Sequence, residues 1–102
     1  MNDVQLELNQ YKQGRFFISE NGQTLAEMRI GISQQKLIAY HTEVFDKIKG
    51  KGMGKMLLDE MVRYAREHQL KVAALCPYVN AQFNRHPELY EDIWLKNYKE
   101  QA

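Results

Sequence analysis

A chain of 102 residues, of which 44% are hydrophobic and 26% charged, is long enough for one domain with one core and needs no disulfide or metal ion for stability. Its net charge of +1 excludes a general attraction to nucleic acid or anionic lipid, and no apolar stretch reaches the roughly 18 residues of a membrane span. One cysteine excludes an internal disulfide framework, and the N-terminus lacks the segments of a signal peptide, so residues 1–102 are expected to form one cytoplasmic domain.

The first half of the sequence has the alternation of apolar and polar residues that is typical of β-strands. The pair Asn21-Gly22 separates two such runs and is a strong signal for a tight β-hairpin, because a type I′ turn needs positive φ at both of its central positions. An antiparallel meander is therefore expected, with strands at residues 4–8, 15–20, 23–32 and 36–45.

The second half changes to the 3.6-residue period of amphipathic helices. Apolar residues recur at helical spacing over residues 53–68, which predicts one long helix. The apolar run at residues 72–76 is typical of a strand buried on both faces, and a strand–helix–strand crossover places it parallel to the fourth strand. This gives an α/β (α+β) domain with a mixed, mostly antiparallel sheet of about five strands.

Two prolines mark the remaining elements. Pro77 stops the last strand and suits the first turn of a helix over residues 78–85. A final helix is expected to start at residues 86–88 and to carry Tyr90, Ile93, Trp94 and Tyr98 on its apolar face. The predicted order of elements is ββββ-α-β-α-α.

Three glycines in five residues lie between the fourth strand and the long helix, where they form a candidate phosphate-binding turn. Glycine lets the backbone approach a ligand closely, and the N–H groups and dipole at a helix start attract phosphate. The alternative is a solvated basic turn whose glycines serve only tight packing. A Walker loop is excluded because Met56 stands where it needs Ser or Thr, and the dinucleotide fingerprint G-x-G-x-x-G fails as well. The turn comprises Lys49, Gly50, Lys51, Gly52, Met53, Gly54 and Lys55.

Residues 49–54 resemble the R/Q-x-x-G-x-G/A loop that binds acetyl-coenzyme A in the GNAT superfamily of N-acetyltransferases, with Lys49 in the place of the Arg or Gln. The order of elements is similar to that fold. The sequences Leu-Cys-Pro-Tyr-Val at 75–79 and His-Pro-Glu-Leu-Tyr at 86–90 resemble a narrower group, the minimal GNAT-like proteins of the YjdJ type. The resemblance extends from about residue 16 to residue 94.

This resemblance implies that acetyl-CoA is the cofactor and that its pyrophosphate rests on the amides of residues 51–54. It also implies that the pantetheine arm pairs with the fourth strand near Phe45, where the fourth and last strands separate. The thioester would then point towards Cys76, with Tyr78 close to the cofactor.

Transfer of an acetyl group to an amine needs a neutral amine, a polarised thioester carbonyl and a proton for the leaving thiolate. By simple alternation, His41 and Glu43 share one face of the fourth strand with Leu37 and Ala39, which would place both at the gap. His41 is a candidate base, and Glu43 either orients it or acts as the base itself. The alternative is that both residues only mark the polar face of the sheet.

Cys76 is a candidate nucleophile, because it precedes a helix start and would have His41 across the gap. The alternative is a buried cysteine that acts as a small hydrophobe. Two routes therefore stay open. In one, His41 or Glu43 deprotonates an amine that attacks the thioester directly; in the other, Cys76 takes the acetyl group first.

The helix after the last strand departs from the superfamily motif N-x-x-A-x-x-[FL]-Y. Asn80 fits, but Pro87 stands in the place of the Tyr that protonates the thiolate. Tyr78, Cys76 and His86 are the possible substitutes, although His86 is better explained as capping the last helix.

The short stretch at residues 9–13 leaves no room for the helices that usually wall the acceptor site. An acceptor amine on a protein, peptide or polyamine is expected, and the second hypothesis is a coenzyme A-binding or sensing module with little catalysis. One cysteine and three histidines lack zinc-ligand spacing, so no metal site is expected. The chain is expected to be a monomer or weak dimer, and the lysine-rich turn is not expected to bind nucleic acid.

Overall fold

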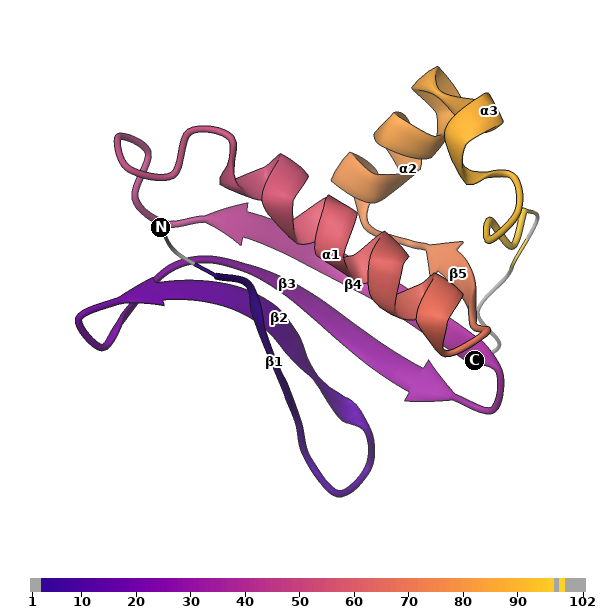
Figure 1. Ribbon diagram of the computed structural model, residues 1–102, viewed down its shortest axis with the longest axis horizontal. Coiled ribbons are helices and arrows are strands. Elements are labelled where there is room, and N and C mark those ends of the chain that lie inside the picture. The colour runs from indigo at the N-terminus through magenta and orange to yellow at the C-terminus, as the bar shows by residue number, and fades with distance from the viewer. Residues whose placement is uncertain (1–2, 97, 99–102) are drawn as a thin grey trace.

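The computed structural model describes residues 3–96 and 98, which form one five-stranded sheet with a long helix across one of its faces (Figure 1). The strands lie in the order β1-β2-β3-β4-β5; neighbours among the first four are antiparallel, and β5 is parallel to β4. This confirms the predicted mixed sheet and the order ββββ-α-β-α-α. Within the described part, no helix is long and apolar enough to cross a bilayer. The elements are β1 (Gln5–Leu8), β2 (Gln13–Glu20), β3 (Gln23–Ser33), β4 (Lys36–Val44), α1 (Met53–Glu67), β5 (Lys71–Ala74), α2 (Pro77–Arg85) and α3 (Pro87–Tyr90).

The hairpin between β2 and β3 turns at Asn21 and Gly22, as the sequence predicts. Their φ angles are 52° and 79°, so both residues lie in the left-handed region that a type I′ turn requires. The strand pairing closes directly on the turn, with Glu20 opposite Gln23.

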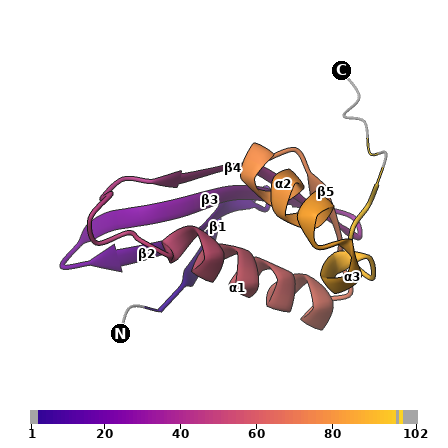
Figure 2. The same cartoon turned by 90° about the horizontal axis from the view of Figure 1, so that it is seen from above.

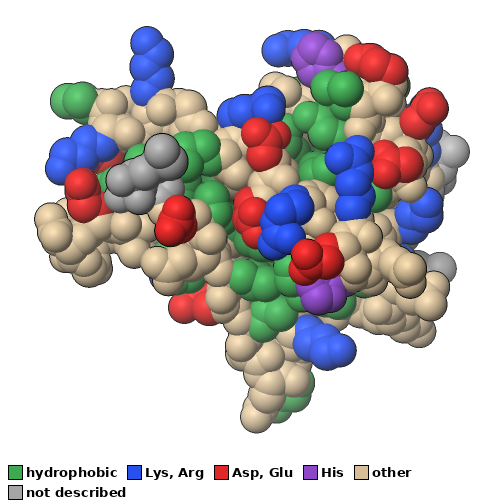
Figure 3. Space-filling view, in the orientation of Figure 1, with side chains coloured by type: hydrophobic (Ala, Val, Ile, Leu, Met, Phe, Trp, Pro, Cys, Tyr) green, Lys and Arg blue, Asp and Glu red, His purple; other side chains and the backbone are tan. Residues whose placement is uncertain are grey.

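Helix α1 covers one face of the sheet, and α2 continues from the end of β5 beside β4 (Figure 2). The apolar stripe of α1 packs on the inward side chains of β2, β3 and β4. Each large apolar side chain buried in this way contributes about 1.5–3 kcal/mol to the free energy of folding. Basic and acidic side chains lie next to one another on the outer side of this layer (Figure 3). The buried residues of the helix are Met53, Leu57, Leu58, Met61, Val62 and Ala65, and those of the sheet include Phe16, Ile18, Met28, Ile30 and Leu37.

A β-bulge interrupts β4 beside its pairing with β3. His41 pairs with Arg29, whereas Ala39 pairs with Ile30, so Tyr40 is an extra residue with no partner in β3. Because side chains alternate with a period of two, one extra residue moves every later side chain of the strand to the other face.

The side chains of β4 therefore exchange faces at the bulge. Leu37 and Ala39 are fully buried on the side of α1. Beyond the bulge that side is taken by Thr42, which pairs with a buried residue of β3, while His41 and Glu43 lie on the opposite face. The prediction that His41 and Glu43 share a face with Leu37 and Ala39 is wrong, although the two remain neighbours of each other.

The predicted continuation of the last helix to Tyr98 is also wrong, because the chain returns to the sheet after α3. The N–H of Val72 donates to the carbonyl of Ile93 at 2.7 Å, and the N–H of Leu95 donates to the carbonyl of Val72 at 2.8 Å. Trp94 thus forms a parallel bridge with Val72. The backbone groups on the outer edge of β5 need partners, and this requirement outweighs the helical spacing of the aromatic residues.

Candidate functional site

A gap opens in the sheet where β4 and β5 separate. The two strands pair only from Lys36 opposite Lys71 to Ala39 opposite Ala74. The N–H of Cys76 then donates to the carbonyl of Ala39 at 2.7 Å, after which the chain turns into α2. β4 continues to Val44 without a neighbouring strand on that side among residues 3–96. Its open edge is the kind to which an extended ligand can add.

The loop between β4 and α1 is held in shape by Asp46. Its carboxylate oxygen Oδ1 accepts hydrogen bonds from the N–H groups of Ile48 at 3.1 Å and Lys49 at 2.8 Å. Its main-chain carbonyl accepts from the N–H of Gly50 at 2.7 Å. Sequence reasoning missed Asp46, although an Asp that bonds the amides two and three residues later is a common turn device.

Four amides at the start of α1 are left open by this loop. Met53 donates to the carbonyl of Gly50 at 2.9 Å, and Met56 donates to Gly52 at 3.2 Å. In contrast, no acceptor within the described residues takes a hydrogen bond from the four remaining N–H groups. Those groups belong to Lys51, Gly52, Gly54 and Lys55.

Glycine stands at each of the three positions of the turn for a different physical reason. A Cβ atom on Gly50 would overlap the Val44 side chain and the Asp46 carbonyl, so this glycine serves packing. Gly52 has a φ of 83°, which favours glycine. At Gly54 a Cβ atom would only reach ordinary contact with Tyr78, 3.5 Å from its Cζ atom, and φ is not positive. Nothing in the fold requires Gly54, although glycine in a helix costs up to about 1 kcal/mol relative to alanine.

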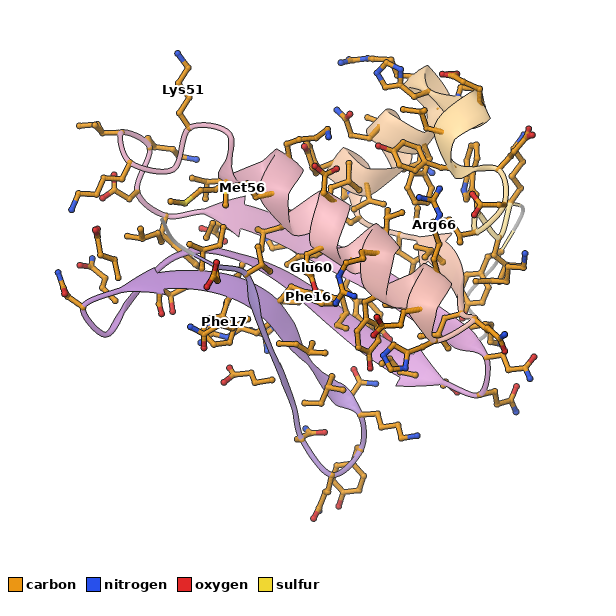
Figure 4. The ribbon with its side chains drawn as sticks, in the orientation of Figure 1. Phe16, Phe17, Lys51, Met56, Glu60 and Arg66 are labelled. Atoms are coloured by element: carbon orange, nitrogen blue, oxygen red, sulfur yellow. The ribbon has the colours of Figure 1, made fainter. Side chains whose placement is uncertain are left out.

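The lysines of the loop differ in their pairing. Lys49 Nζ lies 3.1 Å from Glu20 Oε2, and Lys55 Nζ lies 2.7 Å from Asp59 Oδ1. The hydrogen bond to Asp59 raises the pKa of Lys55 above its ordinary value. Lys51 projects from the tip of the loop away from the sheet (Figure 4).

Two apolar side chains beside the loop are exposed. Phe45, which follows β4, is 49% exposed, and Ile48 is 91% exposed. A ligand that follows the open edge of β4 towards the start of α1 would therefore pass Phe45.

Tyr78 lies in the first turn of α2 and brings a phenol next to the glycine-rich turn. Its hydroxyl oxygen is 3.6 Å from the position of a Cβ atom on Gly54. Burial raises the pKa of Tyr78 above its ordinary value, and the nearby positive charge of Lys55 opposes this shift only in part. The phenol of Tyr78 therefore stays protonated at physiological pH.

His86 is the substitute acid that the geometry favours least. It lies at the C-terminal end of α2, where its Nδ1 atom is 3.9 Å from Glu88 Oε2. It occupies the N-cap position of α3, as expected, but its side chain forms no capping hydrogen bond.

Cys76 is buried, with 1% of its surface exposed, and its Sγ atom lies 3.2 Å from Thr42 Oγ1. His41 lies on the other face of the sheet, where its Nε2 atom is 3.4 Å from Glu43 Oε1. The bulge at Tyr40 therefore separates the two candidate groups that simple alternation brings together. Thr42 was missed because a bulge leaves no mark in the sequence of one strand.

The gap is thus reached from both faces of the sheet. Cys76 and Thr42 line the side of the gap that faces α1. His41 and Glu43 approach it from the opposite face of the sheet, which no helix among residues 3–96 covers and which is called the uncovered face. Among the side chains that the structure describes, no group of three or more potential ligands could hold a metal ion. Such an arrangement places side chains that can exchange protons on both sides of the gap.

Comparison with known proteins identifies a family and a similar fold. A family model described as GCN5-related N-acetyl-transferase matches residues 15–93. The fold is similar to the NMR solution structure of a GCN5-like candidate N-acetyltransferase from Staphylococcus aureus, with a TM-score of 0.68 and 26% sequence identity. The match covers 100% of this chain and 98% of the other. No curated protein sequence matches the chain.

Proposed function

Because the chain belongs to the GCN5-related N-acetyltransferase family, we propose that it transfers the acetyl group of acetyl-CoA to an amine. The observation that carries this proposal is the position of the open amides at the start of α1 relative to the open edge of β4. The loop that Asp46 orders joins the two directly. One continuous surface thus offers donors for a diphosphate and a strand edge for an extended amide chain.

The residues present fit acetyl-CoA, which supplies an activated acetyl group. The amides of Lys51, Gly52, Gly54 and Lys55 would hold the pyrophosphate. The remaining predicted contacts, Lys49, Gly50 and Met53, shape the turn and its charge. Phe45 and the edge of β4 would hold the pantetheine arm, which leads the thioester to the gap beside Cys76.

In this proposal the acceptor amine comes from the uncovered face, where His41 takes the proton that the attacking nitrogen loses. Glu43 orients His41 through the contact of 3.4 Å. The new N–C bond replaces the C–S bond of the thioester. The departing thiolate takes its proton from solvent, because Tyr78 lies beside the amides that hold the diphosphate and not at the thioester. The proton on His41 passes to solvent, so that the products are the acetylated amine and free coenzyme A.

The direct route is better supported than an acyl-enzyme on Cys76. The nearest polar partner of the thiol is the neutral hydroxyl of Thr42, and no base within the described residues contacts it. Of the features that favour a thiolate, Cys76 has the helix start of α2 but no base within the described residues beside it.

The test combines a binding and a turnover measurement. Amide chemical shifts of the labelled protein are followed during titration with acetyl-CoA, and release of free thiol is measured over a panel of amines. We expect the largest shifts at the four open amides and thiol release that depends on the amine. Unchanged amide shifts of the loop at saturating acetyl-CoA would contradict the proposal, and binding without thiol release would leave only the coenzyme A-binding module.

A further inference from the structure

The uncovered face of the sheet carries a row of charged residues that leads to His41. Cross-strand pairing places Glu7 beside Arg15, Arg15 beside Arg29, and Arg29 beside His41. Side chains at directly paired positions lie on the same face with Cβ atoms about 5 Å apart. Arg29 is therefore the cation next to the proposed base.

The two arginines of this row differ in how many hydrogen bonds and ion pairs they form. Arg15 donates to Glu7 at 2.6 Å, to Glu27 at 2.8 Å and to Thr24 at 3.2 Å, and its side chain is 23% exposed. Arg29 has one ion pair within the described part of the chain, to the second oxygen of Glu27 at 3.5 Å, and its side chain is 61% exposed. Most of the five N–H donors of Arg29 have no partner among residues 3–96 and can bind a ligand.

Arg29 also lines a small hollow on the sheet. The hollow has a volume of about 190 Å³, and Arg29 is its one charged lining residue; the others are Asn9, Gln13, Gly14, Ile30 and Tyr40. Its size is below the roughly 300 Å³ of an ordinary small-molecule pocket, so it suits one end of a ligand rather than a whole ligand. A guanidinium with polar amide neighbours matches a carboxylate, which it can bind through two parallel hydrogen bonds.

We propose that Arg29 binds a carboxylate of the acceptor and that the acceptor is a small amino acid-like molecule in which a short spacer separates the amine from the carboxylate. This inference rests on the proposed acetyl transfer. His41 and Glu43 face the amine end, and Arg29 faces the anionic end. The ammonium form releases one proton to solvent before attack, and the attacking nitrogen gives its second proton to His41 as in the proposed transfer. A polyamine would instead place a second positive charge beside Arg29.

The test measures kcat/KM for matched amines with and without a carboxylate: β-alanine against propylamine, and 4-aminobutyrate against butylamine. We expect the ratio within each pair to favour the carboxylate, and to fall about tenfold in Arg29→Gln, because a charge-assisted bidentate contact is lost. Arg29→Lys should restore part of the ratio. Arg85→Gln, which removes the same charge at the end of α2, should leave the ratio unchanged.

A second readout does not depend on turnover. Chemical-shift titration with N-acetyl-β-alanine should move the Arg29 side-chain and Tyr40 signals in the native protein, whereas N-acetylpropylamine should move neither. In Arg29→Gln the Tyr40 signal should stay in place with both compounds. Acetylation that shows no preference, or a preference for spermidine, overturns this inference and leaves the proposed function intact. Titration without shifts at Arg29 also overturns it, and failure of every amine to release thiol overturns the proposed function.

Discussion

Thr42 Oγ1 and Cys76 Sγ lie 3.2 Å apart, and this contact joins β4 to the start of α2 at the point where β4 and β5 separate. Thr42 reaches the thiol only because the bulge at Tyr40 turns it towards the helices. The same bulge turns His41 to the uncovered face. One extra residue therefore decides which side chain meets the cysteine and which turns to the opposite face of the sheet.

Cys76→Ala tests the role of the thiol that Thr42 contacts. We expect acetyl transfer to stay within about threefold of the native rate, because no base among residues 3–96 contacts the thiol. Stability should fall by about 1 kcal/mol for the lost sulfur atom. Thiol release and intact mass after incubation with acetyl-CoA provide the measurement. A stable acetyl adduct that disappears in Cys76→Ala, together with a hundredfold loss of rate, would establish the acyl-enzyme route.

His41→Gln tests the role of the histidine that the bulge turns to the uncovered face. Loss of the base should lower kcat about a hundredfold, since general-base catalysis contributes roughly 10² to 10⁴. The free energy of unfolding should change by less than about 0.5 kcal/mol because the side chain is 56% exposed. Glu43→Gln, which only removes the partner of His41, should cost less than His41→Gln. Equal activity of all three proteins would remove both residues from the proposed site.

Local patterns predicted most of the fold, and long-range pairing decided the parts that they missed. Asn21-Gly22 and the apolar stripe of α1 each carry their signal within a few residues. The bulge at Tyr40 depends on how β4 pairs with β3. The return of residues 93–95 to the sheet depends on the backbone groups of Val72 at the outer edge of β5. The glycine-rich turn was recognisable, whereas the open amides depend on hydrogen bonds that a sequence does not show.

Gly54→Ala separates ligand binding from folding. The native φ of Gly54 suits alanine and the new Cβ atom meets only an ordinary contact with Tyr78, so stability should rise by up to about 1 kcal/mol. Affinity for coenzyme A should fall tenfold or more, because the methyl group would occupy the place of the diphosphate. Urea unfolding and calorimetric titration give the two quantities. Unchanged affinity would contradict the placement of the phosphates.

Two other glycines serve as controls for that variant. Gly22→Ala, in the β2–β3 hairpin, forces a left-handed alanine and should cost about 1 kcal/mol without any effect on coenzyme A. Gly52→Ala should lower both stability and affinity, because its φ of 83° also disfavours a side chain. Gly54 is therefore the informative position.

Arg66 and Asp92 fasten the segment after α3 to α1. Arg66 donates to both carboxylate oxygens of Asp92, at 2.9 and 3.0 Å, and to the carbonyl of Leu89 at 2.7 Å, so it reaches from α1 towards α3 (Figure 4). The hydrogen bond from Arg66 lowers the pKa of Asp92 in the folded protein.

The lowered pKa gives the pair a definite pH dependence. Its stabilisation is complete above the unfolded pKa of about 3.9 and is lost as the pH falls towards the folded value. Since both side chains are about half exposed, the contribution should be no more than about 1 kcal/mol. Asp92→Asn should lower stability at pH 7 by this amount and change it little at pH 2, as measured by urea unfolding. Asp3→Asn is the matched control, because Asp3 forms no ion pair within the described residues; an equal effect at both pH values would contradict the assignment.

Tyr78→Phe tests the contact between α2 and the glycine-rich turn. The phenol lies beside Gly54, and burial raises its pKa above the usual value near 10, so it stays protonated through the neutral range and can donate to a phosphate oxygen. Its removal should weaken the affinity for coenzyme A about tenfold, because one hydrogen bond to a charged group is lost, while kcat changes little. The affinity of the native protein should also fall at alkaline pH as Tyr78 loses its proton, and this fall should be absent from Tyr78→Phe. Tyr11→Phe, at an exposed position in the β1–β2 turn, should change neither quantity. A hundredfold loss of kcat at unchanged affinity in Tyr78→Phe would make the phenol the acid for the departing thiolate and would contradict the placement of the diphosphate on Gly54.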